Sequence, residues 1–414
     1  MHFSKAQRYS LISVIIIYTA AYLNRLNLAA ALNSIINTFS ITPAQGGLLQ
    51  SVFALTYTIG QLVNGSIAER VNARNHMLLG LSGSAICNLL MSLCPSYPLF
   101  IVLCVLNGAF QSMMWTIIVR LIGIVFPEKK SQRNANLYLS VFMILGHLGA
   151  WAISGYMAES IDWHLSFRIP GLIGIPAVII AWMMLNPIKD SLTPSVTRMN
   201  KGAKKAIPIR FLIQTGFIPI MLSCVLYGFV RDGITTWAPT ILQGMKEGST
   251  ISSTTFSLII PMLNLVGLFI SFWLMGHVPG NVRRIIALMI LACAFFCLFL
   301  RAGSNVMILT AIFMGAACAC LNGLNILLTS VIPLEYAPFG HASITAGLID
   351  SLIYLGSALT GVATGSIIGT SGVNSLYWIW VALTIIGSAL MFLSGKPRYM
   401  DQLTSDTPQT SVKS

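Results

Sequence analysis

The sequence predicts an all-α membrane protein with 12 transmembrane helices arranged in two pseudo-symmetric six-helix halves. Three observations predict this fold class. Of the 414 residues, 56% are hydrophobic and only 8% are charged, whereas about a quarter of the residues in a soluble globular protein are charged. Twelve apolar runs approach or exceed the length that crosses a bilayer, which is ~20 helical residues. An arginine also recurs at matching places in the two halves.

The twelve runs are separated by short polar or Gly/Pro breaks. They cover residues 9–32, 44–65, 76–96, 98–124, 135–157, 169–187, 214–242, 252–275, 285–301, 305–330, 342–369 and 374–394. The first run is longer than the apolar segment of a signal peptide, and eleven more follow it. We therefore expect the first run to remain in the protein as a membrane span.

One long hydrophilic connection divides the chain near its midpoint and carries its densest cluster of basic residues. Such a charged stretch is typical of a solvated linker. The expected organisation is an N-terminal half at 1–187, a cytoplasmic linker at 188–210, a C-terminal half at 211–394 and a disordered cytoplasmic tail at 395–414.

Lysine and arginine residues gather on one side of the predicted spans. Eighteen of the 24 lie at the N-terminus, in even-numbered connections or in the C-terminal tail. By the positive-inside rule, both termini are then cytoplasmic. We expect a monomer in the lipid bilayer of a bacterial-type inner membrane. The net charge of +13 is explained by this orientation signal, so the sequence argues against a nucleic-acid partner.

Several classes of chemistry have no residues to support them. All eight cysteines lie in or beside apolar runs, which argues against a disulfide scaffold or a zinc site. The sequence contains no phosphate-binding glycine loop, nucleophile elbow or cluster of metal ligands. We therefore expect neither an enzyme nor a cofactor.

The first run carries a cation, Arg25, well inside its apolar length. A charge at membrane depth costs at least ~3 kcal/mol, so it usually faces a protein interior or an aqueous cavity and has a function there. Tyr18 and Tyr22 precede Arg25 by seven and three residues, which places all three on one helical face. We interpret this face as the lining of a path for an anion.

Arg25 has a counterpart in Arg231, in the first span of the second half. Many secondary transporters are built from internal repeats with the binding site between them. Guanidinium groups are always charged and forked, so two of them converging on an oxyanion can form bidentate bonds. In the empty protein the two cations repel one another, so ligand binding should favour the state that brings the halves together.

The segment 65–74, after the second run, resembles the signature loop of the major facilitator superfamily, which has the form G-x-x-x-[DE]-R-x-G-R. Asn72 replaces the second glycine of that pattern. The resemblance implies a fold of two six-helix halves and alternating access. It also implies that Glu69, Arg70 and Arg74 form contacts between helices that differ between the two states.

Further segments are similar to the organophosphate:phosphate antiporter family, which includes the glycerol-3-phosphate and hexose-phosphate carriers. These segments are 110–120, 231–239, 334–338, 346–347 and 354–356. The resemblance implies that Arg25 and Arg231 grip the anionic group of the substrate. The other residues expected at the substrate site are Tyr18, Tyr22, Tyr57, Gln61, Trp115, His147, Asp350 and Tyr354.

The chain departs from that family at several of these places. Gln61 stands where the phosphate-ester carriers have a lysine, Thr236 and Asn264 replace two acids, and the span-five histidine is shifted to His147. Fewer cationic and titratable groups favour a different anion, such as a carboxylate or a sulfonate. A phosphorylated sugar or glycerol stays open, and so does exchange for phosphate.

Two carboxylates lie within predicted spans and are candidates for coupling transport to protons. Successive helix residues point about 100° apart, so Asp232 need not touch Arg231 and can face another helix or water. Asp350 either contacts substrate or a proton, or forms a structural hydrogen bond. His147 is a hydrogen-bond donor, a proton carrier or a packing residue.

The roles of other polar residues in the spans can be interpreted in two ways. Arg120 is expected to support the cytoplasmic gate rather than to bind substrate. Asn24, Asn27, Asn322 and Asn325 either hold substrate hydroxyls or join helices. Gly146, Gly149, Gly356 and Gly361 are expected to permit close approach of helices.

We expect a secondary active transporter of a small organic anion, namely an organophosphate, a sugar acid or a sulfonated sugar. Alternating access would drive uptake by phosphate exchange or proton symport. One alternative is a proton-coupled sugar-acid symporter resembling the anion:cation symporters, whose first span carries a similar Tyr-Leu-[DN]-Arg-x-Asn stretch. A second is a transporter-like membrane receptor that senses such an anion.

Overall fold

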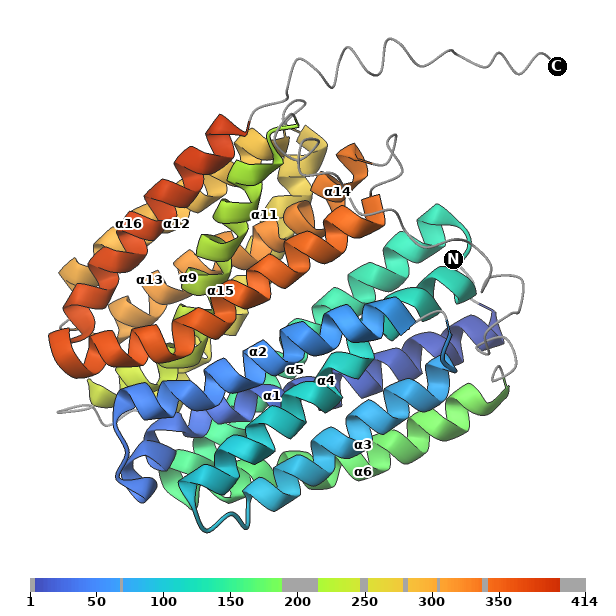
Figure 1. Ribbon diagram of the computed structural model, residues 1–414, viewed down its shortest axis with the longest axis horizontal. Helices are drawn as coiled ribbons and strands as arrows, with labels where there is room; N and C mark the ends of the chain where they lie inside the picture. Colours follow the sequence, from blue (N-terminus) through green and yellow to red (C-terminus); the bar gives the residue numbers. More distant parts are fainter. Residues whose placement is uncertain are drawn as a thin grey trace.

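The computed structural model of the chain describes residues 4–67, 70–187, 215–245, 252–277, 282–303, 306–336 and 342–394. Every regular element in these ranges is helical. Figure 1 shows two groups of long helices that lie side by side. The expected linker at 188–210 and the expected tail at 395–414 lie outside the described residues.

Each predicted run corresponds to one helix or to consecutive helical segments. The N-terminal half contains α1 (Lys5–Phe39), α2 (Pro43–Ile67), α3 (Ala73–Met91), α4 (Tyr97–Val125), α5 (Lys129–Ser160) and α6 (Leu165–Leu185). The C-terminal half contains α9 (Phe217–Gly244), α10 (Ser253–Ser257), α11 (Ile259–His277), α12 (Val282–Gly303), α13 (Met307–Ile326), the π-helix η2 (Leu327–Val331), α14 (Ile332–Glu335), α15 (Ala342–Ser371) and α16 (Val373–Leu393).

Local caps explain where two of the helices begin. At the start of α1, the Ser4 hydroxyl accepts a hydrogen bond from the backbone of Gln7, and the Gln7 side chain accepts one from the backbone of Ser4. This reciprocal pair is a capping box. Asn72, which replaces a glycine of the signature loop, accepts a hydrogen bond from the backbone N–H of Asn75 at 3.1 Å and caps α3. The substitution therefore has a structural use, because asparagine is a favoured N-cap residue.

Two predicted spans are broken by proline. The run at 252–275 forms α10 and α11 with a break at Leu258, since Pro261 has no N–H to bond the carbonyl of Ser257. The run at 305–330 passes from α13 into η2. Pro333 removes the next α-helical donor there, and the chain accommodates it with a π-turn.

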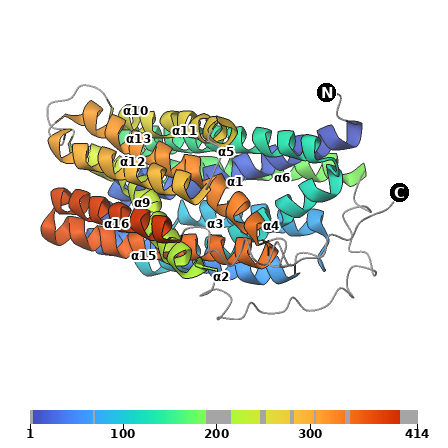
Figure 2. The same cartoon turned by 90° about the horizontal axis from the view of Figure 1, so that it is seen from above.

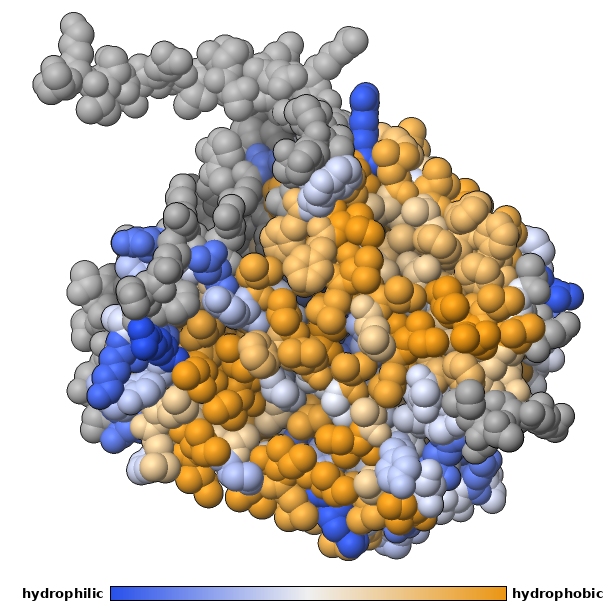
Figure 3. Space-filling model, turned by 180° about the vertical axis from the view of Figure 1, so that it is seen from behind, coloured by the Kyte–Doolittle hydropathy of each residue, from blue (hydrophilic) through white to orange (hydrophobic). Residues whose placement is uncertain are grey.

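The outer surface has the character of a protein in lipid. In the described ranges, ten helices are long and apolar enough to cross a membrane, while α2 and α3 carry more polar residues and are less apolar. Large apolar side chains are exposed on the bundle, such as Met183 at 60% and Trp273 at 59%. Figure 3 shows apolar residues covering most of one face, with hydrophilic groups gathered towards its margins. The chain is a multi-pass membrane protein.

The two halves contact one another along two seams, in which α2 packs against α15 and α5 packs against α10 and α11, and α1 contacts α9 between these seams. Figure 2 shows the two seams on opposite sides of the bundle. We call the end of the bundle where α1 begins and α16 ends the terminal end. The opposite end, where α1 ends and α2 begins, is the distal end.

A carboxylate joins the halves at the distal end of the second seam. Glu159, near the end of α5, accepts hydrogen bonds from two hydroxyls and two backbone N–H groups at the start of α10. The donors are Ser252 Oγ at 2.5 Å, Ser253 N and Oγ at 3.2 and 3.1 Å, and Thr254 N at 3.2 Å. Hydrogen bonds to a charged acceptor are stronger than neutral ones, so Glu159 holds the distal end closed.

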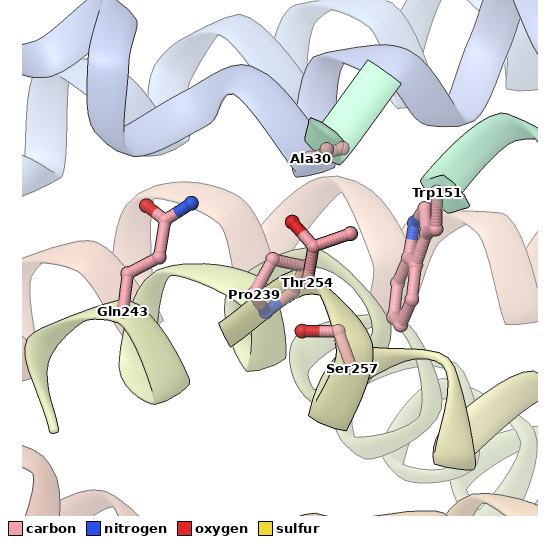
Figure 4. Close-up of a pocket in the computed structure, with 7 residues that line it drawn as sticks. Ala30, Trp151, Pro239, Gln243, Thr254 and Ser257 are labelled. Carbon is pink, nitrogen blue, oxygen red and sulfur yellow. The ribbon is translucent and has the colours of Figure 1, made fainter. Parts of the chain in front are cut away.

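Apolar packing and close backbone contact complete this closure. Ala30, Leu32 and Trp151 from the N-terminal half belong to the same buried cluster as Trp237 and Ile241 of α9. Figure 4 shows Trp151 and Ala30 facing the side chains of the C-terminal half across a small pocket. The pocket is lined by Ala30, Trp151, Gly155, Pro239, Gln243, Thr254 and Ser257.

Glycines permit close approach of helices, both between the halves and within each half. A Cβ atom on Gly361 would lie 2.4 Å from the carbonyl oxygen of Gly47, and one on Gly356 would lie 2.1 Å from that of Val225. A Cβ atom on Gly146 would lie 3.2 Å from Tyr22. Close approach is therefore confirmed at these three glycines. It is wrong for Gly149, where an added Cβ would make only an ordinary contact at 3.7 Å.

Candidate functional site

Arg25 lies at mid-depth of α1, with its guanidinium surrounded by aromatic rings. Its Cζ atom is 4.6 Å from the ring centroid of Tyr57 and 5.4 Å from those of Phe53 and Tyr354. Tyr354 belongs to α15, so Arg25 contacts both halves. Among the described residues the guanidinium forms no hydrogen bond or ion pair. Aromatic faces attract the cation without using its N–H groups, which leaves all five donors for a ligand.

Polar residues beside Arg25 fix its position rather than face the site. Asn27 donates to Asn88 Oδ1 on α3 at 2.7 Å, and Asn24 donates to the carbonyl of Pro170 on α6 at 3.1 Å. Both asparagines are buried. The structure thus favours the helix-joining interpretation for Asn24 and Asn27, and they anchor the turn that carries Arg25.

The other aromatic residues predicted from the sequence gather around the same turn. The Tyr18 ring lies 5.2 Å from that of Tyr22 and 5.3 Å from that of Trp115, measured between ring centroids. The amide of Gln61 donates to the Tyr57 hydroxyl at 2.6 Å. The Tyr57 ring also contacts that of Tyr354 across the seam in a tilted arrangement, with centroids 4.7 Å apart. The structure therefore brings α1, α2, α4 and α15 together around Arg25.

Arg231 has a different environment from Arg25. Its Nε and NH2 groups donate to the two carboxylate oxygens of Asp232 at 2.7 and 3.0 Å. Its NH1 group lies 3.3 Å from both the Tyr227 hydroxyl and Asn325 Oδ1. Arg231 is therefore engaged by a fork-to-fork ion pair and by weaker bonds to neutral groups.

The pair between Arg231 and Asp232 was not predicted. The angle of about 100° between successive helix residues separates the two Cα–Cβ bonds, but the arginine stem is long enough to fold back along the helix. Asp232 also accepts a hydrogen bond from the Ser357 hydroxyl of α15. The carboxylate is thus held between its own helix and a neighbouring one, and it faces Arg231 rather than water.

Asp350 lies near the two arginines and His147 lies near Arg25, and neither has a strong partner among the described residues. Asp350 is partly buried on α15, one turn before Tyr354, and lies within electrostatic range of both Arg25 and Arg231. It forms no hydrogen bond or ion pair with another described residue. The His147 ring contacts Trp151 edge-on, with centroids 4.6 Å apart, and its Nε2 atom has no hydrogen-bond partner in the described part of the chain.

Comparison with known proteins identifies the family of this chain. The family profile described as Major Facilitator Superfamily matches residues 14–360. The chain belongs to the major facilitator superfamily.

Named relatives narrow the comparison within the major facilitator superfamily. A protein named membrane sensor protein UhpC from Salmonella typhimurium is 23% identical, over 86% of this chain and 84% of its own. A glycerol-3-phosphate transporter from Bacillus subtilis is 23% identical, over 93% and 92% of the two chains. These relatives are consistent with the expected resemblance to the organophosphate:phosphate antiporters.

A solved structure shows the same fold. The structure, described as a bacterial homolog of the human lysosomal transporter Spinster, aligns with a TM-score of 0.74 and 18% identity. The alignment covers 97% of this chain and 99% of that one. The major facilitator superfamily fold is therefore supported by sequence and by structure.

The charged residues of the signature loop and span four lie at the terminal end, away from the arginines. Arg120 donates to the carbonyl of Val71 at 2.9 Å and thereby ties α4 to the loop before α3. Arg74 donates to Asn186 Oδ1 at 2.9 Å, at the end of α6, and Arg70 is exposed. Glu69 lies outside the described residues. A gating role for these four residues stays a prediction.

Sequence reasoning missed three residues at the site. Tyr227 lies four residues before Arg231, and Ser357 lies seven after Asp350, so helical spacing contained the signal for both. Phe53 precedes Tyr57 by one turn and stacks on it, with centroids 6.2 Å apart. Asn325, left open from sequence, contacts Arg231 and Tyr227.

Proposed function

We propose that this protein is a secondary active transporter of a small organic anion, with Arg25 and Arg231 at the substrate site. The observation that carries the proposal is the state of Arg25. A guanidinium at mid-membrane depth rests on aromatic faces and has no anionic partner among the described residues. A cation kept without a partner at this depth is costly unless a ligand supplies the negative charge.

The position of Arg25 between the halves supports alternating access. It contacts Tyr57 from one half and Tyr354 from the other. An anion bound to Arg25 therefore changes the energy of a contact between the halves, which is the requirement for a ligand to shift a conformational equilibrium. The closed distal end then belongs to one of two states. With both termini in the cytoplasm, that closed end faces the periplasm across an inner membrane.

Asp350 is the residue whose role would differ between proton symport and phosphate exchange. A symporter needs a protonatable group in range of the substrate, and Asp350 lies in range of both arginines. In an exchanger, Asp350 would be a bystander, and phosphate inside the vesicle would drive uptake.

A membrane receptor is the second candidate function, because a relative over most of the chain is named a membrane sensor protein. A receptor uses the same anion site but moves no substrate through the membrane. The two functions are separated by measuring binding and transport in the same preparation.

The test uses the full chain in proteoliposomes and a panel of labelled anions: glycerol 3-phosphate, hexose 6-phosphate, hexonate, hexuronate and a 6-sulfonated hexose. Uptake is measured with internal phosphate or with an inward proton gradient. We expect Arg25→Lys to abolish uptake while Arg168→Lys, an exposed arginine on α6, leaves it unchanged. Binding without uptake would indicate a receptor. Uptake that Arg25→Lys leaves intact would refute the proposed site.

A further inference from the structure

We infer that Asp232 acts as a built-in anion on Arg231, so that the site selects monoanions such as carboxylates and sulfonates over dianionic phosphate esters. This inference rests on the proposed function, and it assigns the charge class of the substrate. It starts from the difference in hydrogen bonding between the two arginines.

The N–H groups of the two guanidinium groups show which arginine is available. Each guanidinium has five N–H donors. On Arg231, two donors are committed to the carboxylate of Asp232 and the NH1 group faces Tyr227 and Asn325. On Arg25, no donor is used by another described residue. A substrate oxyanion can therefore bind all the N–H donors of Arg25, but only those N–H donors of Arg231 that Asp232 leaves unused.

The Asp232 carboxylate is held so that a substrate does not readily displace it. It belongs to the residue next to Arg231 on α9, so the two groups move together. The Ser357 hydroxyl of α15 donates to one of its oxygens. Behind it, α9 and α15 approach so closely that a Cβ atom on Gly228 would lie 2.0 Å from the carbonyl oxygen of Ile353. The carboxylate thus stays in place when the site fills.

The charges around the site then limit what it accepts. Arg25 and Arg231 contribute two positive charges, and Asp232 cancels one of them. Asp350 lies in range of both arginines and cancels the other when it is ionised, while His147 adds a positive charge only when it is protonated. With His147 neutral, a monoanion therefore meets at most one unbalanced cation, whereas a dianion would carry an uncompensated charge into a region of low dielectric.

The test compares anions that share one skeleton and differ by one charge. A hexose 6-phosphate is mostly dianionic at about pH 7.5, because the second pKa of a phosphate monoester is about 6, whereas a 6-deoxy-6-sulfohexose stays monoanionic. Glycerol 3-phosphate and glycerate form a second pair. Inhibition constants are measured for each compound in proteoliposomes that take up whichever labelled anion the wild-type protein transports.

In the wild-type protein we expect the monoanion of each pair to bind about tenfold more tightly than the dianion. Asp232→Asn keeps the side-chain shape and removes the charge. It should therefore change the ratio of the two inhibition constants about tenfold in favour of the dianion, which is the change expected from one charge-assisted contact. Ser357→Ala keeps the charge but loosens its hold, and should move the ratio about two- to threefold in the same direction. Asp162→Asn is the matched control, because Asp162 lies in the distal loop and pairs with His164; its ratio should equal that of the wild type.

Each result decides the inference. A wild-type protein that prefers the phosphate ester, or an Asp232→Asn variant with an unchanged ratio, overturns the inference and leaves the proposed transporter standing. If Asp232→Asn does not fold, judged by gel filtration in detergent, an unchanged ratio in Ser357→Ala overturns it instead. If the wild type neither binds nor transports any anion of the two pairs or the wider panel, the proposed function fails, and the inference fails with it.

Discussion

Arg25 and Arg231 occupy matching spans of the two halves, yet their surroundings are opposite. Arg25 lies on three aromatic rings and keeps its donors unused by the described residues, whereas Arg231 is paired with the carboxylate of its neighbour Asp232. The pseudo-symmetry of the fold therefore does not extend to the chemistry of the site. One arginine is prepared to receive an anion, and the other already has one.

This difference also revises the view of the empty protein. Two bare guanidinium groups would repel one another, which the sequence suggested as a force that separates the halves. Asp232 removes most of that repulsion at Arg231. The energy by which a ligand draws the halves together must then come mainly from Arg25 and from its contact with Tyr354.

The largest expected effect comes from exchanging each arginine for lysine. Arg25→Lys should lower uptake at least about 100-fold, because an ammonium group cannot form the bidentate bonds of a guanidinium. Arg231→Lys should lower it only about tenfold, since lysine can still pair with Asp232 while the anion binds Arg25. Initial uptake rates, normalised to reconstituted protein, check both. Equal losses would show that the two arginines contribute alike.

The aromatic support of Arg25 is the next target. Tyr57→Leu should weaken anion binding about fivefold to tenfold, because it removes the ring nearest the guanidinium, and a partly desolvated cation–π contact is worth ~1–2 kcal/mol. Tyr57→Phe keeps that ring and serves as the control, with an expected loss of less than about threefold. Binding is followed by the thermal shift that the anion produces. The idea fails if the phenylalanine variant is as weak as the leucine variant.

Asp350 offers a test of coupling rather than of affinity. In a proton symporter, Asp350→Asn should abolish uptake driven by a proton gradient but change counterflow, which needs no net proton movement, by less than about threefold. Asp162→Asn provides a matched control at a carboxylate outside the spans. In an exchanger, the asparagine variant should behave as the wild type under internal phosphate. Loss of counterflow together with gradient-driven uptake would instead place Asp350 in direct contact with the substrate.

The smallest effect concerns the distal closure. Glu159→Gln removes the charge that strengthens four hydrogen bonds to the start of α10, so the state closed at this end should lose about 0.7–1.4 kcal/mol. A single cysteine placed near the distal pocket should then react about threefold to tenfold faster with a membrane-impermeant thiol reagent. An unchanged rate would mean that apolar packing around Trp151 alone holds the closure.

The fold followed from the sequence because lipid imposes simple rules on a chain. Apolar length predicted every span, and the positions of lysine and arginine predicted an orientation. The two broken spans were missed because Pro261 and Pro333 sit within apolar runs whose hydropathy hides the break. Proline acts through a missing donor rather than through polarity.

The site was predicted in part for a similar reason. Residues that share a helix with an arginine could be found by spacing, as with Tyr18 and Tyr22. Contacts between distant helices could not, so the sequence did not reveal that Tyr354 covers Arg25 or that Ser357 holds Asp232. The pair between Arg231 and Asp232 escaped because a helical-wheel argument compares Cβ directions and ignores the reach of a long side chain.

The contact between Gly47 and Gly361 offers a way to shift the protein from one conformation to the other. An alanine at position 47 would place its methyl carbon 1.9 Å from the carbonyl oxygen of Gly361, so α2 and α15 would have to separate there. Such a variant should act as a wedge that favours the state open at the distal end. Such a variant would hold one conformer for raising antibodies or for determining the structure of the state open at the distal end by electron cryomicroscopy. If a cysteine near the distal pocket reacts with a thiol reagent at an unchanged rate, the helices accommodate the methyl group without opening this end.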